Sequence, residues 1–168
     1  MDKLEVIIHE FFKEYAGLES LKNAALLVCR RDGVPLFSYK TFESSWNDST
    51  AGALIGGMWQ AAETLTQFIP EVRDEDFRFS FDTSSRGIFI IELSGNFEPL
   101  YLSYIYYNLD NPARMKSRVK SIKDKLDLYL DDHLSNQVAR VDKKDKEVFL
   151  FSDISDDEMD DLFSEVIA

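Results

Sequence analysis

Apolar residues recur along the chain at two spacings, which together predict a mixed α/β domain. Three segments repeat apolar residues every three or four positions, as amphipathic helices do: 4–18, 50–69 and 112–134. Five others alternate apolar with polar residues or run continuously apolar, as strands do: 24–31, 34–41, 77–81, 88–93 and 99–107. The order is therefore helix, two strands, helix, three strands, helix. We expect an α/β (α+β) fold in which a five-stranded, mostly antiparallel sheet is flanked by helices.

The chain changes character beyond this domain. We expect a domain over residues 1–134, a linker with a short apolar segment over 135–151, and an acidic amphipathic tail over 152–168. Apolar residues of the tail follow helical spacing between flanking acids: Met159, Leu162, Phe163, Val166 and Ile167. This pattern predicts a short helix that forms when it docks in a groove, either of a partner or of the same protein. The alternative is an acidic disordered tail that serves solubility.

Charge and composition argue against several classes of function. The 168 residues carry a formal net charge of −12, and seven acids and no base lie between Asp153 and Glu165. This balance argues against nucleic acid as a partner, because the phosphate backbone requires a basic surface. No run of 18 apolar residues predicts membrane insertion, and the acidic N-terminus lacks the basic start of a signal peptide. The expected location is the cytoplasm.

Sequence signatures of enzymatic chemistry are missing. Cys29 is the only cysteine, so neither an intramolecular disulfide nor a Cys/His zinc site is expected. The common nucleotide-binding, metalloprotease and serine-hydrolase motifs are also absent. We therefore expect no catalytic residues, no cofactor and no metal, and a protein that is not an enzyme.

Two stripes of mainly apolar residues run along the helix predicted over residues 50–69. One stripe holds Leu54, Met58, Ala61, Ala62, Leu65 and Phe68, and the other holds Gly52, Ile55, Gly56, Trp59 and Glu63. A glycine inside a helix costs up to about 1 kcal/mol relative to alanine, so Gly52, Gly56 and Gly57 require a compensating contact. Close approach of another helix supplies one, and the second stripe is therefore predicted to be a dimer or partner interface around Trp59. The alternative is close packing of this helix on its own sheet.

Four segments resemble the roadblock/LC7 family. They are AALLVCRRDGVPLFS (24–38), AGALIGGMWQAAETL (51–65), RGIFIIEL (86–93) and PLYLSYIYYNLDNPARMKSRV (99–119). In that family a buried strand with an Asp-Gly turn precedes an alanine-rich helix that often ends in Ala-Ala-Glu-x-Leu, here residues 61–65. The central strand then leads through a short Asn/Asp loop, here residues 108–111, into the last helix.

This resemblance implies a homodimeric adaptor or regulator of a Ras-like small GTPase. Family members dimerise through the second helix and the third strand, which gives a sheet that runs through both subunits. In this chain Phe77, Phe79 and Phe81 fall on that strand, and an apolar edge strand invites pairing. Ordinary core alternation is the alternative explanation for these phenylalanines. Members act as scaffolds or GTPase regulators, and bacterial ones act on a polarity GTPase; here the tail could hold a second protein.

Two alternatives belong to other classes of protein. Longin and profilin-like domains have a similar order of elements, and a sensory domain of this kind would hold an apolar ligand in a cavity lined by Phe79, Ile90 and Tyr104. A chaperone-like module would instead recognise another protein through the acidic tail.

Overall fold

The computed structural model describes the following residues, to which every statement below is limited: 2–15, 17–43, 45, 47–68, 78–93 and 98–144, without the side chains of 15 and 135–144. The chain divides into two compact units, Met1–Asp132 and His133–Ala168, and each is described by itself. In the second unit, the described part is the end of one helix, up to residue 144. Phe77 and the predicted tail over 152–168 therefore lie outside the described residues.

The first unit contains a five-stranded sheet, and its elements follow the predicted order. The helices are α1 (Lys3–Tyr15), a 3-10 helix (Gly17–Ser20), α2 (Asp48–Thr66) and α3 (Pro112–Lys144). The strands are β1 (Ala24–Arg30), β2 (Pro35–Lys40), β3 (Arg78–Asp82), β4 (Arg86–Leu93) and β5 (Leu100–Tyr107). They lie in the order β2-β1-β5-β4-β3, and each strand is antiparallel to its neighbours. The predicted fold class is confirmed, and β2 and β3 form the two edges of the sheet.

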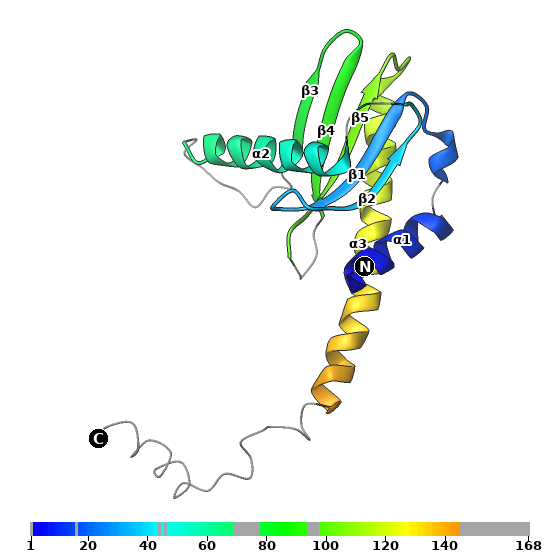
Figure 1. Ribbon diagram of the computed structural model, residues 1–168, viewed down its shortest axis with the longest axis vertical. Coiled ribbons are helices and arrows are strands. Elements are labelled where there is room, and N and C mark those ends of the chain that lie inside the picture. The colour runs from blue at the N-terminus through cyan, green and yellow to red at the C-terminus, as the bar shows by residue number, and fades with distance from the viewer. Residues whose placement is uncertain are drawn as a thin grey trace, which may run out of the picture. The chain divides into compact units, whose positions relative to one another are not determined.

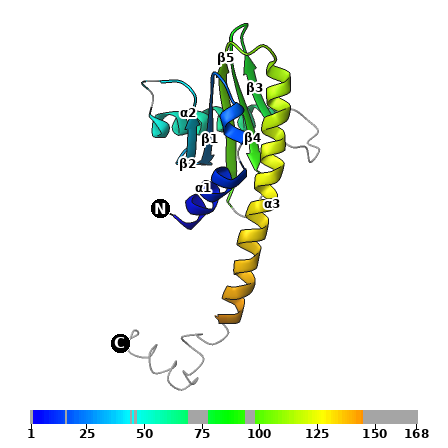
Figure 2. The same ribbon diagram turned by 90° about the vertical axis from the view of Figure 1, so that its right-hand side faces the viewer.

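Helices cover both faces of this sheet. α2 crosses one face, whereas α1 and α3 lie on the other (Figure 1 and Figure 2). Alternation along β5 supplies both layers, because Tyr101 packs in the cluster under α2 while Leu102 and Tyr104 point to the opposite face. β1, in the interior of the sheet, is buried along nearly its whole length. The core therefore has two layers, with the sheet between them.

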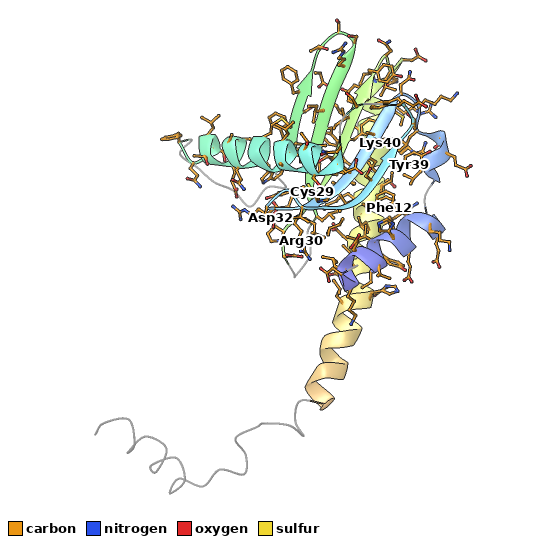
Figure 3. The ribbon with its side chains drawn as sticks, in the orientation of Figure 1. Phe12, Cys29, Arg30, Asp32, Tyr39 and Lys40 are labelled. Carbon is orange, nitrogen blue, oxygen red and sulfur yellow. The ribbon has the colours of Figure 1, made fainter. Side chains whose placement is uncertain are left out.

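Side-chain contacts fix the start of α2 beside β2. Asn47 caps the helix, since its side-chain oxygen accepts a hydrogen bond of 2.6 Å from the backbone N–H of Thr50. Asp48, in the first turn, forms an ion pair of 3.0 Å with Lys40 at the end of β2. Figure 3 labels Lys40 close to the beginning of α2. From this anchored start, α2 runs across the sheet toward β3 (Figure 1).

α3 is longer than the sequence pattern predicts. The apolar spacing fades near residue 134, whereas the helix runs to Lys144. Residues 135–144 are polar, which indicates a linker, but they contain neither glycine nor proline. A polar segment without a helix breaker can continue a helix that has already formed. The helix thus covers the first part of the predicted linker.

Candidate protein interface

The two stripes of α2 have different surroundings. The inner stripe is buried in the subunit itself: Gly52, Ile55, Gly56 and Trp59. Ile55 and Trp59 pack in a core cluster with side chains of β1, β4 and β5, and the Trp59 ring lies 4.7 Å from the ring of Tyr101. Contacts within one subunit thus account for the burial of these four predicted interface residues.

Two glycines of the inner stripe let α2 touch the turn between β1 and β2, where Figure 3 labels Asp32. Gly33, in that turn, has a φ of +85°, a conformation that favours glycine. A Cβ atom on Gly52 would lie 2.1 Å from the carbonyl oxygen of Gly33. A Cβ atom on Gly56 would lie 3.1 Å from the carbonyl oxygen of Arg31. The close approach that these glycines permit is therefore made with the chain's own turn, which is the alternative left open by the sequence.

The other stripe, which we call the outer stripe, is exposed at most of its positions, although Met58 packs against the core cluster. Leu54, Leu65 and Phe68 are 63%, 67% and 80% exposed. Gly57 is exposed too, and a Cβ atom there would have no described atom within 4 Å. Large apolar side chains in such a row are typical of a surface that another protein covers. Periodicity identifies both stripes, but it cannot tell which of them faces the sheet.

β3 lies next to the end of α2 and forms an open edge. It pairs with β4 on one side, and no described strand pairs with its other side. Phe79 is half-buried against the core cluster under α2, whereas Phe81 is 57% exposed. An open edge that carries an exposed aromatic side chain is suited to pairing with another strand.

An apolar hollow lies on the α2 side of the sheet, near the end of β3 that holds Phe81. Its volume is about 690 Å³. Side chains from the end of β2 and from three neighbouring strands line it, including Phe42, Phe81, Ile88, Ile105 and Tyr107. Phe81, Ile88 and Ile105 are neighbours across β3, β4 and β5, so they form one row on this face. The hollow, the open edge and the outer stripe therefore share one side of the subunit.

The opposite side of β3 is fixed to α3. Asp82 accepts hydrogen bonds from the hydroxyl of Tyr106 and from Lys116, whose Nζ lies 2.5 Å from the carboxylate. The same Nζ lies 2.6 Å from the hydroxyl oxygen of Ser80. Lys116 and, after it, Tyr106 hold the pKa of Asp82 below its usual value. Asp82 is therefore ionised at neutral pH, and its contacts hold the edge strand against the helix.

Glu63 belongs to a small charged cluster where α2 crosses β4. Its carboxylate forms an ion pair of 2.9 Å with Arg31. Burial and, after it, repulsion from Glu63 raise the pKa of Glu92 on β4. Arg31 is paired with Glu63 alone, and its positive charge only partly offsets the rise in the pKa of Glu92.

Cys29 and the other candidate chemical groups do not form a site in the described part of the chain. Cys29 lies on β1 where α2 crosses it (Figure 3), and burial raises the pKa of its thiol to about 12. No cluster of three His, Cys, Asp or Glu side chains among the described residues could hold a metal ion. Within the described ranges, none of the helices combines the length and the hydrophobicity that a membrane span requires. The exposed apolar surface at α2 and β3 is the strongest candidate site that they offer.

The cavity expected for an apolar ligand is not formed by the three residues predicted to line it. Phe79 and Ile90 are paired neighbours on the α2 side of the sheet. Tyr104 points to the other side, and it is fully buried, as is Ile90. Strand alternation places the sheet between them, so these three residues do not line the shared cavity that would favour the ligand-binding alternative.

Comparison with known proteins supports the fold directly. No family model and no curated protein matches the sequence. Among solved structures, the gliding protein MglB from Thermus thermophilus is similar with a TM-score of 0.60 and 16% identity, over 79% of this chain and 94% of that chain. MglB from Myxococcus xanthus has a TM-score of 0.56 and 14% identity, over 77% and 89%. A roadblock/LC7 domain from Streptomyces avermitilis has a TM-score of 0.54 and 12% identity, over 67% and 89%. The chain therefore has the roadblock/LC7 fold, as the sequence resemblance predicts.

Proposed function

We propose that the protein is a homodimeric adaptor that binds a Ras-like small GTPase. The observation that carries the dimer is the presence of three features on one side of the subunit: the exposed stripe of α2, the open edge of β3 and the apolar hollow. The GTPase follows from the roadblock/LC7 resemblance, and the fold supports it. Because proteins of this fold include a gliding protein, a role in bacterial polarity or motility is part of the proposal.

A two-fold axis at the open edge of β3 makes these features complementary. At one end of β3, Phe79 and the last turns of α2 line a small cavity. The hollow surrounds Phe81 at the other end. Figure 1 shows the C-terminal half of α2 projecting past β3. Rotation by 180° exchanges the two ends of the strand, so each projecting helix reaches the hollow of the other subunit. Leu65 and Phe68 would then be covered.

Gly57 supports the same arrangement. A glycine in the interior of a helix costs up to about 1 kcal/mol relative to alanine. Gly52 and Gly56 are explained by the turn at Gly33, but Gly57 faces open space in the subunit. Close approach of a second protein along the outer stripe would offset its cost.

The sequence of this protein has no nucleotide-binding motif. The dimer would therefore bind the GTPase without contributing such a motif to its active site. Any effect on GTP hydrolysis would therefore come from reshaping the active site of the GTPase itself. We assign a second contact to the tail, with Leu162 and Phe163 at the centre of its apolar positions. The dimer would thus join two partner proteins, or bind one partner through two separate contacts.

Leu65→Glu tests the interface. It places a charge on the outer stripe, and Leu128→Glu on α3 is its matched control, because Leu128 is 68% exposed and Leu65 is 67% exposed. We expect Leu65→Glu to weaken dimerisation by about tenfold or more, as truncation of a central apolar contact does, while Leu128→Glu dimerises like the unaltered chain. Sedimentation velocity measures the effect, and circular dichroism confirms folding. Equal effects of the two substitutions would contradict the proposed interface.

Binding of the GTPase is tested separately. Ras-like GTPases of the source organism, loaded with GDP or a non-hydrolysable GTP analogue, are titrated with the purified full chain in a calorimeter. We expect one of them to bind, with a preference for one nucleotide state. Failure of all of them in both states would remove the GTPase from the proposal and leave the dimer standing.

A further inference from the structure

The described part of β3 is self-complementary about Ser80. The strand reads Arg78-Phe79-Ser80-Phe81-Asp82. A basic residue at the first position is matched by an acidic residue at the last, and a phenylalanine lies on each side of Ser80. The strand therefore carries opposite charges at its two ends and a phenylalanine on either side of its middle residue. This is the pattern that an antiparallel pair of identical strands can use.

The fold restricts how two copies of β3 can pair. If both copies of α2 lie on the same side of a continuous sheet, residues that face α2 must oppose residues that face α2. Phe79 and Phe81 face α2, whereas Ser80 and Asp82 face α3. Two residues that lie directly opposite each other must therefore both have odd numbers or both have even numbers. The partner strand can shift along β3 only by amounts that keep this match.

Among these registers, the one centred on Ser80 matches all five positions. It sets Arg78 against the partner's Asp82 and Phe79 against the partner's Phe81. A register centred on Phe79 sets Arg78 against the partner's Ser80, and one centred on Phe81 sets Asp82 against the partner's Ser80. Both alternatives lose the two charge pairs. Opposite charges and aromatic pairs directly across a sheet are favourable, so the Ser80 register is preferred.

The surroundings of the two charged residues fit this register. Asp82 is held in place by Lys116 and Tyr106, so its carboxylate has a fixed position at the end of the strand. Arg78 is exposed and forms no ion pair with any described residue. The Arg78 guanidinium thus lies at one end of the open edge and the Asp82 carboxylate at the other. A two-fold axis through the middle of the strand would bring each group next to the opposite group of the partner.

The position of α2 agrees with the same register. Thr66, in the last turn of α2, lines a small cavity together with Phe79 and Arg78. In the Ser80 register the partner's Phe81 lies directly opposite Phe79, and it is therefore close to the end of this helix. That is the placement required for the projecting helix to cover the partner's hollow.

In the proposed dimer the β3 strands of two copies lie antiparallel, and we propose that Ser80 lies on the two-fold axis, in a register set by ion pairs between Arg78 and the partner's Asp82. This inference rests on the proposed dimer and names its geometry. It predicts one particular set of neighbours across the axis.

Cysteine cross-linking tests the register on the full chain. Opposed residues in an antiparallel pair have Cα atoms about 4.5–5.5 Å apart, which is within the range of a disulfide. Ser80→Cys should therefore form a disulfide between subunits under mild oxidation, whereas Ser85→Cys, in the turn after β3, should not. The native Cys29 is buried, and the unaltered chain serves as the control for it. A dimer in which Ser80→Cys fails to cross-link would overturn the register but not the dimer.

Charge reversal gives a second, independent readout. Arg78→Asp should weaken dimerisation by about tenfold or more, because it creates two like-charge pairs across the axis. Arg78→Lys keeps the positive charge, and we expect it to dimerise nearly as tightly as the unaltered chain. An Arg78→Asp variant that dimerises as tightly as Arg78→Lys would overturn the ion pairs. An unaltered chain that stays monomeric would overturn both the register and the proposed dimer.

Discussion

At the scale of single residues, glycine decides how α2 lies on the subunit. Gly52 and Gly56 bring the helix against the backbone of the turn at Gly33, while Gly57 faces open space. The sequence shows that three helical glycines need an explanation, but it does not show which surface provides it. Both stripes repeat at the helical period, so only the arrangement in space separates the glycines of the inner packing from the exposed one.

Replacing Gly52 tests this packing. Gly52→Ala should destabilise the subunit by about 2 kcal/mol or more, because its Cβ would lie 2.1 Å from a backbone oxygen and the helix or the turn must move. Gly57→Ala is the matched control, and it should leave the subunit at least as stable, since alanine is the better helix former. Urea unfolding at one low protein concentration measures both variants. Equal midpoints would show that the close approach at Gly52 contributes nothing.

At the scale of elements, periodicity predicts the helices and strands well, but not their neighbours. The three helices and five strands predicted for the domain over 1–134 are present, because their apolar positions show the period of the element in the sequence. The order of the strands in the sheet cannot be read from periodicity, because it depends on residues that are far apart in the chain. Ala24 of β1, for example, pairs with Tyr106 of β5. The residue at which α3 ends could not be predicted either, because polar residues without glycine or proline fit both a linker and a helix.

The contact between α2 and β4 makes a pH-dependent contribution to stability. Burial and the neighbouring Glu63 raise the pKa of Glu92 in the folded state, so its ionisation at neutral pH disfavours folding. Glu92→Gln should therefore raise the midpoint of thermal unfolding at pH 7. The gain should shrink as the pH falls toward about 4, where the carboxyl group is protonated in both states.

Glu19→Gln is the control for this substitution, because Glu19 is exposed and forms no ion pair with a described residue. It should change the midpoint little at either pH. If Glu92→Gln lowered the midpoint at pH 7, the attraction between Arg31 and the Glu92 carboxylate would outweigh the cost of burying that carboxylate.

For the molecule as a whole, the proposed dimer depends on a surface that the sequence identifies only in part. The resemblance predicts contact through the second helix and the third strand, and several of the exposed apolar side chains do lie on those two elements, including Leu54, Leu65 and Phe81. The particular residues differ, since Gly52, Ile55 and Trp59 are buried within the subunit. A hydrophobic pattern shows that a helix has two apolar sides, whereas the choice between core and interface depends on packing with distant segments.

Native mass spectrometry of the unaltered full chain is the sharpest test of the proposed dimer. We expect a species of twice the subunit mass of 19.4 kDa at micromolar concentration, because an exposed apolar helix face and an open strand edge are covered when two copies meet. A strictly monomeric species at the same concentration would show that the proposed dimer does not form.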